Sequence, residues 1–170
     1  MARGREVIFG VTLVGVLIAD QVTKALIRAK LAVGASVPLI DGFMDLTHVR
    51  NTGAAFGLFP GRIPVFVGIS TLVLAGIVWV WWRMKPRSTW AVLALGLVAG
   101  GAMGNLIDRI TAGRVTDFFD VGWWPVFNVA DIALDVGVAV LLVWLLFSRE
   151  MNEAGSTPVE VDEEQAESTP

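Results

Sequence analysis

Long runs without charge dominate this chain and restrict it to folds that can bury them in lipid. The twenty residues from Ile63 to Trp82 carry no charge, and neither do the eighteen from Trp90 to Ile107. A helix rises about 1.5 Å per residue, so about 20 apolar residues cross the hydrocarbon core of a bilayer. Each run is therefore predicted to form a transmembrane helix.

Two further apolar runs contain charged residues. The first covers residues 7–27 and includes Asp20 and Lys24, while the second carries two Asp near its start. The sequence DQVTK, rather than a small-residue cleavage site, follows the uncharged part of the first run, so we expect this helix to be retained. The predicted fold class is an all-α integral membrane protein whose four transmembrane helices cover about residues 7–27, 63–82, 90–107 and 126–147.

Charge divides the chain into two parts. The net charge is −3, but seven acids and no base lie from Glu150 onward. The remainder holds thirteen Lys or Arg and nine Asp or Glu. Acidic segments poor in apolar residues stay solvated rather than folding. We therefore expect a membrane domain over residues 1–149 and a disordered acidic tail over residues 150–170.

The basic residues indicate an orientation. Four helices put both termini on one side, and the tight basic clusters, residues 3–5 and 83–87, fall on that side too. Positive residues mark the cytoplasmic face of a membrane protein. As many Lys and Arg are expected on the other side, but they are spread over longer loops among acids. We therefore expect both termini, and the acidic tail, to be cytoplasmic.

The connection between the first two helices contains a hairpin signal. Residues 37–40 and 43–49 flank Asp41-Gly42, a dipeptide suited to the positive φ angles of a tight turn. A small extracytoplasmic β-sheet between helices 1 and 2 is therefore expected. His48 lies in the predicted hairpin and is interpreted as a surface residue of a strand.

Carboxylates at membrane depth are the strongest functional signal. An ionisable residue there costs several kcal/mol unless it is paired, hydrated or used. Two close carboxylates cannot both ionise easily, so they can divide acid and base work. The residues alone offer four candidates and do not choose a pair: Asp117, Asp120, Asp131 and Asp135. Clustered carboxylates also suit hard cations, but no motif such as HExxH is present.

Other polar residues recur at helical spacing. Asp20 and Lys24 are four apart and can form an ion pair, either structural or part of the site. Asn51 precedes a run of small residues that a substrate can approach closely. Two further polar groups each share a helix face: Asn105, Asp108 and Arg109, and Asn128, Asp131 and Asp135. Gly96, Gly100 and Gly104, also four apart, indicate close packing of another helix.

Five motifs in order resemble lipoprotein signal peptidase, also called signal peptidase II, an integral-membrane aspartic peptidase family of the bacterial cytoplasmic membrane. The motifs are DQVTK at 20–24, NTGAAF at 51–56, GNLIDR at 104–109, VTDFFD at 115–120 and FNVAD at 127–131. The resemblance implies that Asp117 and Asp131 are the catalytic pair. It places Asn51, Gly53, Asn105, Arg109, Asn128 and Ala130 at the lining of the site, and Asp20, Lys24 and Asp108 in the supporting structure.

The resemblance also implies a reaction. The substrate would be a prolipoprotein whose lipobox Cys carries a diacylglyceryl group, and the peptide bond before that Cys would be cut. We expect no metal and no other cofactor, a monomer in contact with membrane lipids, and a site near the outer face of the bacterial inner membrane. No nucleic acid is expected, because the basic residues are too scattered for a phosphate track.

Two other functions remain as alternatives to the peptidase, and each assigns a different role to the polar residues. A small proton-coupled transporter would use Asp117 and Asp131 as a proton relay. A non-catalytic membrane subunit would use its polar residues only to hold helices together. The absence of an internal repeat argues against the transporter. One departure from the family pattern is the connection from Asp117 to Asp131, which is shorter than in many members.

Overall fold

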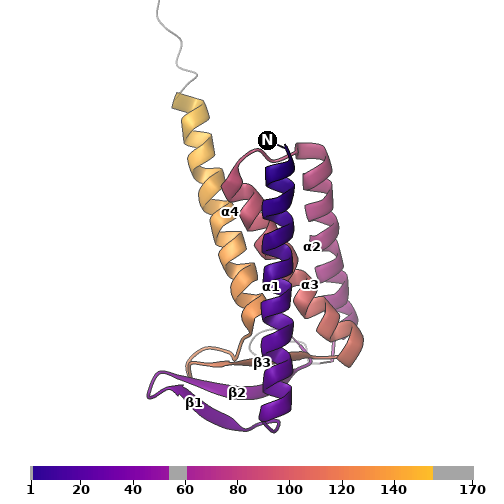
Figure 1. Ribbon diagram of the computed structural model, residues 1–170, viewed down its shortest axis with the longest axis vertical. Helices are drawn as coiled ribbons and strands as arrows, with labels where there is room; N and C mark the ends of the chain where they lie inside the picture. The colour runs from indigo at the N-terminus through magenta and orange to yellow at the C-terminus, as the bar shows by residue number, and fades with distance from the viewer. Residues whose placement is uncertain (1, 54–60, 155–170) are drawn as a thin grey trace, which may run out of the picture.

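Four long helices stand side by side, and a three-stranded sheet lies across one end of them (Figure 1). The computed structural model describes residues 2–53 and 61–154. All four helices are long and apolar enough to cross a membrane, as predicted. Their bounds are α1 Ala2–Lys30, α2 Ile63–Met84, α3 Thr89–Ala112 and α4 Val129–Ala154.

The helix ends differ from the predicted ones for local reasons. Helix α3 continues past Ile107 until Gly113, which adopts the left-handed conformation that ends a helix. Helix α4 begins three residues later than expected, because Phe127 pairs with Phe119 as an isolated bridge. It continues to Ala154, into the predicted tail. Residues 155–170 lie outside the described residues, so disorder there stays a prediction.

Helix α3 is the centre of the bundle, in contact with α1, α2 and α4. Its glycines permit the close approach that their spacing predicts. A Cβ atom on Gly100 would come within 2.7 Å of the Val16 Cβ and 2.9 Å of the Leu13 carbonyl oxygen, both on α1. A Cβ on Gly104 would meet the Asp20 carboxylate. The backbones of α1 and α3 therefore approach too closely for a side chain at these positions.

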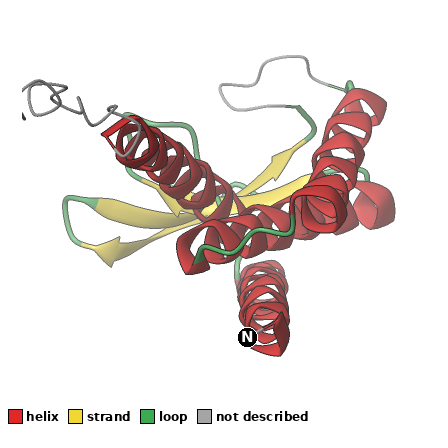
Figure 2. Cartoon of the chain, turned by 90° about the horizontal axis from the view of Figure 1, so that it is seen from above, coloured by secondary structure: helices red, strands yellow, loops and turns green. Residues whose placement is uncertain are grey.

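The sheet is antiparallel in the order β1-β2-β3, with β1 Ser36–Ile40, β2 Met44–Asn51 and β3 Val115–Asp120. Gly42 has φ of 73° in the turn, so the expected hairpin is confirmed. Seen from above, the sheet lies beneath the helices (Figure 2).

Strand β3 was not expected. It comes from the segment between α3 and α4, so the sheet is not confined to the connection between the first two helices. His48 also differs from its interpretation as a surface residue. The residue is only 3% exposed, and its Nδ1 lies 2.9 Å from the Leu31 carbonyl oxygen.

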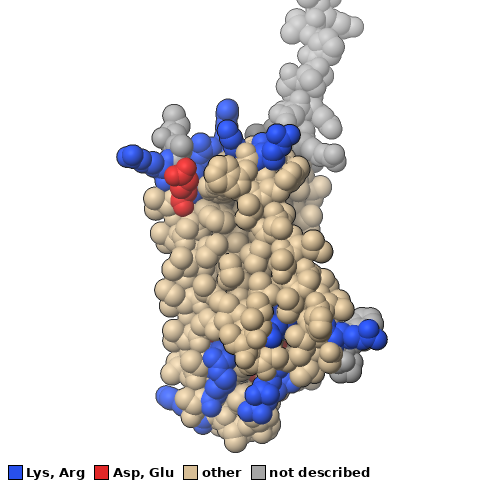
Figure 3. All heavy atoms as spheres, turned by 90° about the vertical axis from the view of Figure 1, so that its right-hand side faces the viewer, with Lys and Arg blue, Asp and Glu red and all other residues tan. Residues whose placement is uncertain are grey.

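Charged side chains gather at the two ends of the molecule and leave an uncharged band between them (Figure 3). Many large apolar side chains in that band are exposed, among them Leu72 at 73% and Val11 at 67%. Water would oppose such exposure, whereas lipid does not. The surface is therefore the one that a bundle spanning a bilayer requires.

Candidate active site

Asp117 lies in the middle of β3, where Val49 of β2 is its partner in the register. The residue is 2% exposed, and two side-chain amides donate to its carboxylate. Asn51, at the end of β2, donates to Oδ2 at 2.9 Å, and Asn128 donates to Oδ1 at 2.6 Å. The sheet therefore brings the first extramembrane segment directly against one predicted catalytic carboxylate.

Asp131 lies in the first turn of α4 and takes part in the cap of that helix. The Asp131 backbone N–H donates to Asn128 Oδ1 at 3.0 Å, and the Asn128 backbone N–H donates back to Asp131 Oδ2 at 3.1 Å. This reciprocal pair is the geometry of a capping box, with Asn and Asp in place of the usual Ser and Glu. The start of α4 and the position of Asp131 are thus fixed by the same two bonds.

Two side-chain amides join the two carboxylates, and we call Asn105 and Asn128 the amide bridge. Asn105 donates to Asp131 Oδ1 at 2.8 Å. Asn128 donates to Asp117 Oδ1, and also to Asn105 Oδ1 at 3.2 Å. Both Asn side chains are buried. Buried polar groups need satisfied partners, so this chain of bonds restricts both carboxylates to one arrangement.

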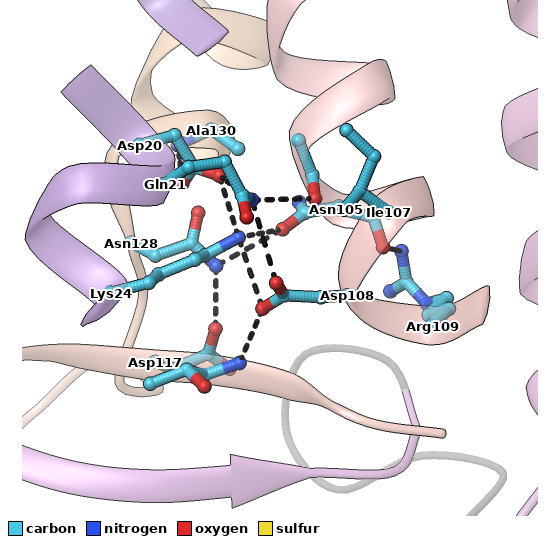
Figure 4. A network of polar contacts seen from close by, with 12 residues as sticks. Asp20, Gln21, Lys24, Asn105, Ile107, Asp108, Arg109, Asp117, Asn128 and Ala130 are labelled. Atoms are coloured by element: carbon cyan, nitrogen blue, oxygen red, sulfur yellow. Dashed lines mark hydrogen bonds and ion pairs between the residues drawn. The ribbon is translucent and has the colours of Figure 1, made fainter. Parts of the chain in front are cut away.

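Lys24, on α1, donates a hydrogen bond to the amide bridge. Figure 4 shows its side chain reaching from α1 into the group of polar residues on α3. The Nζ atom donates to Asn105 Oδ1 at 2.9 Å and lies 2.9 Å from Asp20 Oδ2 and 3.5 Å from Asp108 Oδ2. A cation has no acceptor, so it holds the oxygen of the Asn105 amide toward itself and its NH₂ group toward Asp131.

The remaining carboxylates of this region bind the backbone. Asp20 accepts from the Ala130 N–H at 3.0 Å, and Asp108 accepts from the Thr116 N–H at 3.1 Å. Asp20 therefore ties α1 to the start of α4, and Asp108 ties α3 to β3. Ala130 is fully buried and contributes its N–H rather than its side chain.

A cavity of about 620 Å³ opens beside the amide bridge, and both Asp117 and Asp131 line it. Arg109 lines it as well, with its guanidinium 5.2 Å from the centre of the Phe66 ring. The wall is otherwise mostly apolar or small, and includes Gly53, Val115, Trp123, Trp124, Phe127 and Ile132. A cavity of this kind can hold an extended apolar ligand against two carboxylates.

Burial sets the protonation of Asp117. Its pKa is raised to about 6 from an ordinary value near 3.8, chiefly by loss of water and secondly by the negative charge of Asp131. Hydrogen bonds from Asn51 and Asn128 oppose it, because they stabilise the ionised form. One carboxyl group of the pair can therefore keep a proton near neutral pH, as acid–base catalysis requires.

The other two candidate carboxylates, Asp120 and Asp135, differ in their position relative to the cavity. Asp120 does not line the cavity. Its carboxylate accepts hydrogen bonds from the Thr47 hydroxyl group at 2.9 Å and from the Gly122 N–H at 2.9 Å. Asp135 lines the cavity one turn beyond Asp131. Across the described residues, no three His, Cys, Asp or Glu side chains lie close enough to share a metal ion.

Some contributors were not expected from the sequence, and some expected residues cannot be placed. Gln21 donates to the Gly104 carbonyl oxygen at 3.2 Å and to Asp20 at 3.1 Å, a role that its position beside Asp20 could have suggested. No sequence signal pointed to Phe66 beneath Arg109. Residues 54–56 of the NTGAAF motif lie outside the described residues.

Comparison with known proteins gives one consistent result. Residues 12–147 match a family described as signal peptidase (SPase) II. A lipoprotein signal peptidase of Desulfitobacterium hafniense is 48% identical over 129 residues, which cover 75% of this chain and 85% of that protein. One from Geobacter sulfurreducens is 43% identical, over 80% of this chain and 89% of that one.

A solved structure agrees with these relatives in fold. It is described as a bacterial membrane enzyme and superposes with a TM-score of 0.80 at 32% sequence identity. The match covers 90% of this chain and 93% of the solved one. The four helices and the sheet are therefore shared along nearly the whole length of both proteins.

Proposed function

The chain belongs to the signal peptidase II family, and on that premise we propose that Asp117 and Asp131 are its catalytic pair. It is an aspartic peptidase that cleaves signal peptides from prolipoproteins, and a multi-pass membrane protein of bacteria. The observation that carries the assignment of the pair is the amide bridge, which holds the buried Asp117 and the half-buried Asp131 at the wall of one cavity.

The two carboxyl groups divide the chemistry. One, ionised, accepts a proton from a water molecule as the water attacks the scissile carbonyl carbon. The other, protonated, donates a hydrogen bond to the carbonyl oxygen and then passes its proton to the leaving amine. The raised pKa of Asp117 supports a shared proton near neutral pH. That proton is a property of the coupled pair rather than of either residue.

The surrounding polar residues position the pair. Asn51 and Asn128 orient Asp117, and Asn105 orients Asp131. Arg109 lies at the cavity wall, where it can contact carbonyl oxygens of the bound peptide. Gly53 lets the peptide backbone approach closely, and the remaining residues of the predicted site, Asp20, Lys24, Asp108 and Ala130, hold the helices and β3 in place.

The cavity suits a lipidated peptide. Its apolar wall can take the signal peptide and the acyl chains of a diacylglyceryl-Cys, while the carboxylates face the bond before that Cys. The pair lies at the sheet end of the bundle, opposite the N-terminus (Figure 1). We assign this end to the outer face of the bacterial cytoplasmic membrane, with both termini in the cytoplasm. We propose that the protein acts as a monomer, since a single copy supplies both carboxylates and the amides that orient them.

A direct test measures cleavage of a diacylglyceryl-modified prolipoprotein by the purified protein in detergent, with a metal chelator present. Asp117→Asn and Asp131→Asn are compared with wild type, each checked for an unchanged melting temperature. Asp120→Asn is the matched control, since it makes the same change in the same strand outside the cavity.

We expect wild type and Asp120→Asn to cut and both pair variants to lose activity. Full activity in Asp117→Asn or Asp131→Asn would show that the pair is wrongly assigned. Loss of wild-type activity on addition of the chelator would contradict a mechanism that needs no metal. Carboxylate-dependent proton flux in vesicles without cleavage would favour a transporter instead.

A further inference from the structure

The end of the bundle farthest from the carboxylate pair is strongly basic (Figure 3). Among the side chains that the structure describes, this end carries one acid, Glu6, and five bases, which we call the basic end: Arg3, Arg5, Arg83, Lys85 and Arg87. Anionic lipid headgroups attract such residues within about a Debye length of the membrane surface. The peptidase chemistry at the other end makes no use of them.

A cavity of about 210 Å³ lies within the basic end, between the start of α1 and the end of α2. It is lined by Arg5, Glu6, Trp81, Trp82, Lys85 and Pro86. Arg5 donates from Nη1 to the Pro86 carbonyl oxygen at 3.2 Å, which fixes its guanidinium against the α2–α3 connection. Trp81 packs on Phe9 with ring centres 4.7 Å apart. The cavity therefore has aromatic and cationic walls, in which Arg5 and Trp81 each have a contact that positions them.

The backbone of Lys85 provides a second, independent observation. Lys85 caps α2 in the left-handed conformation, with φ of 47°, and no other described residue except glycine has positive φ. Glycine is favoured at such a cap because L side chains adopt it at a cost. Arg83 supplies a further cation in the last turn of the same helix. A residue whose backbone conformation is costly therefore lines this cavity.

We propose that this cavity binds the headgroup of an anionic phospholipid. Arg5 and Lys85 contact the phosphate, and the indoles of Trp81 and Trp82 lie at the boundary between headgroup and acyl chain. Glu6 repels a doubly charged phosphate but accepts hydrogen bonds from hydroxyl groups. The lipid class that fits these walls is therefore one with a singly charged phosphodiester and a polyol headgroup, such as phosphatidylglycerol.

Native mass spectrometry of the full chain in detergent tests this site, because it counts lipids bound to the intact protein. Seven acids follow Arg149, so the whole chain is used to keep its charge unchanged. Phosphatidylglycerol is titrated against phosphatidylcholine for wild type, Lys85→Gly, Arg5→Gln and Lys30→Gly. Lys30→Gly is the matched control, since it removes one exposed lysine at the sheet end of α1.

Wild type is expected to bind one phosphatidylglycerol in preference to phosphatidylcholine. Lys85→Gly and Arg5→Gln should each weaken that binding roughly fivefold, which is the effect of one basic residue at a membrane surface. Lys30→Gly should leave it unchanged. Lys85→Gly should also melt no lower than wild type, because glycine relieves the positive φ. Weaker binding by that variant would then not result from unfolding.

Four outcomes would overturn the proposal. Equal binding of the two lipids by wild type, or unchanged binding in Lys85→Gly, would exclude a site at this cavity. An equal loss in Lys30→Gly would reduce the effect to net charge. Displacement of the lipid by inorganic phosphate at the same concentration would indicate a site for free anions. Cleavage of prolipoprotein is measured in parallel and should be the same in all of these variants.

Discussion

Asn128 donates a 2.6 Å hydrogen bond to Asp117 across the gap between β3 and α4, and this contact ties the catalytic proposal to the folding of the last helix. The same side chain accepts the Asp131 N–H at the start of α4. One amide therefore orients one carboxylate through its nitrogen and caps the helix that carries the other through its oxygen.

Replacing Asn128 should consequently harm both activity and stability, whereas replacing Asn51 should harm mainly activity. Each variant, Asn51→Ala or Asn128→Ala, removes one donor from Asp117. A hydrogen bond to a charged group contributes about 1.5–3 kcal/mol, so kcat/KM should fall roughly 10- to 100-fold in both. Only Asn128→Ala also loses the cap of α4, worth about 1 kcal/mol. Equal melting temperatures for the two variants would contradict this difference.

Lys24 should be more damaging to remove alone than together with Asp20. Both side chains are fully buried and lie 2.9 Å apart. Lys24→Met leaves buried carboxylates without a cation, which costs about 3–5 kcal/mol, whereas an apolar replacement of the whole pair is often tolerated. The double variant Asp20→Leu/Lys24→Met should therefore unfold at a higher temperature than Lys24→Met in detergent. A double variant less stable than the single one would show that the Asp20 bond to Ala130 matters more.

The activity should fall as the pH rises through about 6, because the carboxylate pair then loses its shared proton. The alkaline limb of the pH profile of kcat/KM reports loss of this proton from the free enzyme. A bound substrate that expels water from the cavity should raise the pKa further, so the alkaline limb of the kcat profile should lie at higher pH. Asn51→Ala removes a bond that lowers the pKa of Asp117, so its limb should shift upward. A downward shift would contradict the assigned contact.

The free energy of unfolding should also depend on pH through the ionisation of Asp117. The folded protein holds the Asp117 proton up to about pH 6, whereas the unfolded chain releases it near 3.8. Between these values the folded state binds more protons, so the contribution of Asp117 to stability falls as the pH rises. Melting temperatures measured from pH 4 to 7 should decline less in Asp117→Asn than in wild type.

The packing of α1 against α3 should fail when a single methyl group is added. Gly100→Ala places a Cβ against Val16, and overpacking of this kind costs about 1–3 kcal/mol. Gly68→Ala is the control, since nothing lies within 4 Å of a Cβ there and alanine favours a helix by about 1 kcal/mol. The two variants should change the melting temperature in opposite directions, and a lower value for Gly68→Ala would contradict this.

Much of the membrane architecture could be predicted from the sequence because its signals are local. An uncharged run of helical length or an Asp-Gly turn determines structure within a few residues. The four helices and the β1–β2 hairpin follow from such signals. Strand β3 does not, because residues 115–120 become a strand only by pairing with β2, which lies about 70 residues earlier.

Only part of the candidate site could be predicted from the sequence, because the rest depends on contacts between distant segments. Spacing placed Asp131 on one helix face with Asn128, but it left four carboxylates as equal candidates. The choice of Asp117 came from a resemblance in motifs, not from physical reasoning. Nothing in the sequence indicates that Asn105 accepts from Lys24 and donates to Asp131, since that geometry depends on three helices meeting. Burial of His48 likewise depends on the end of α1 lying against β2.

The pairing of β2 with β3 sets an order on biosynthesis. A ribosome delivers α1, the β1–β2 hairpin, α2 and α3 before it delivers either residue of the carboxylate pair. The three-stranded sheet is complete only after β3 has been synthesised and has paired with β2. Asp131 forms its hydrogen bonds with Asn105 and Asn128 only after α4 has entered the membrane. If Asp117 and Asp131 are the catalytic pair, a nascent chain that lacks α4 is expected to have no activity toward signal peptides. We therefore expect peptidase activity to appear only after the last transmembrane helix has been inserted.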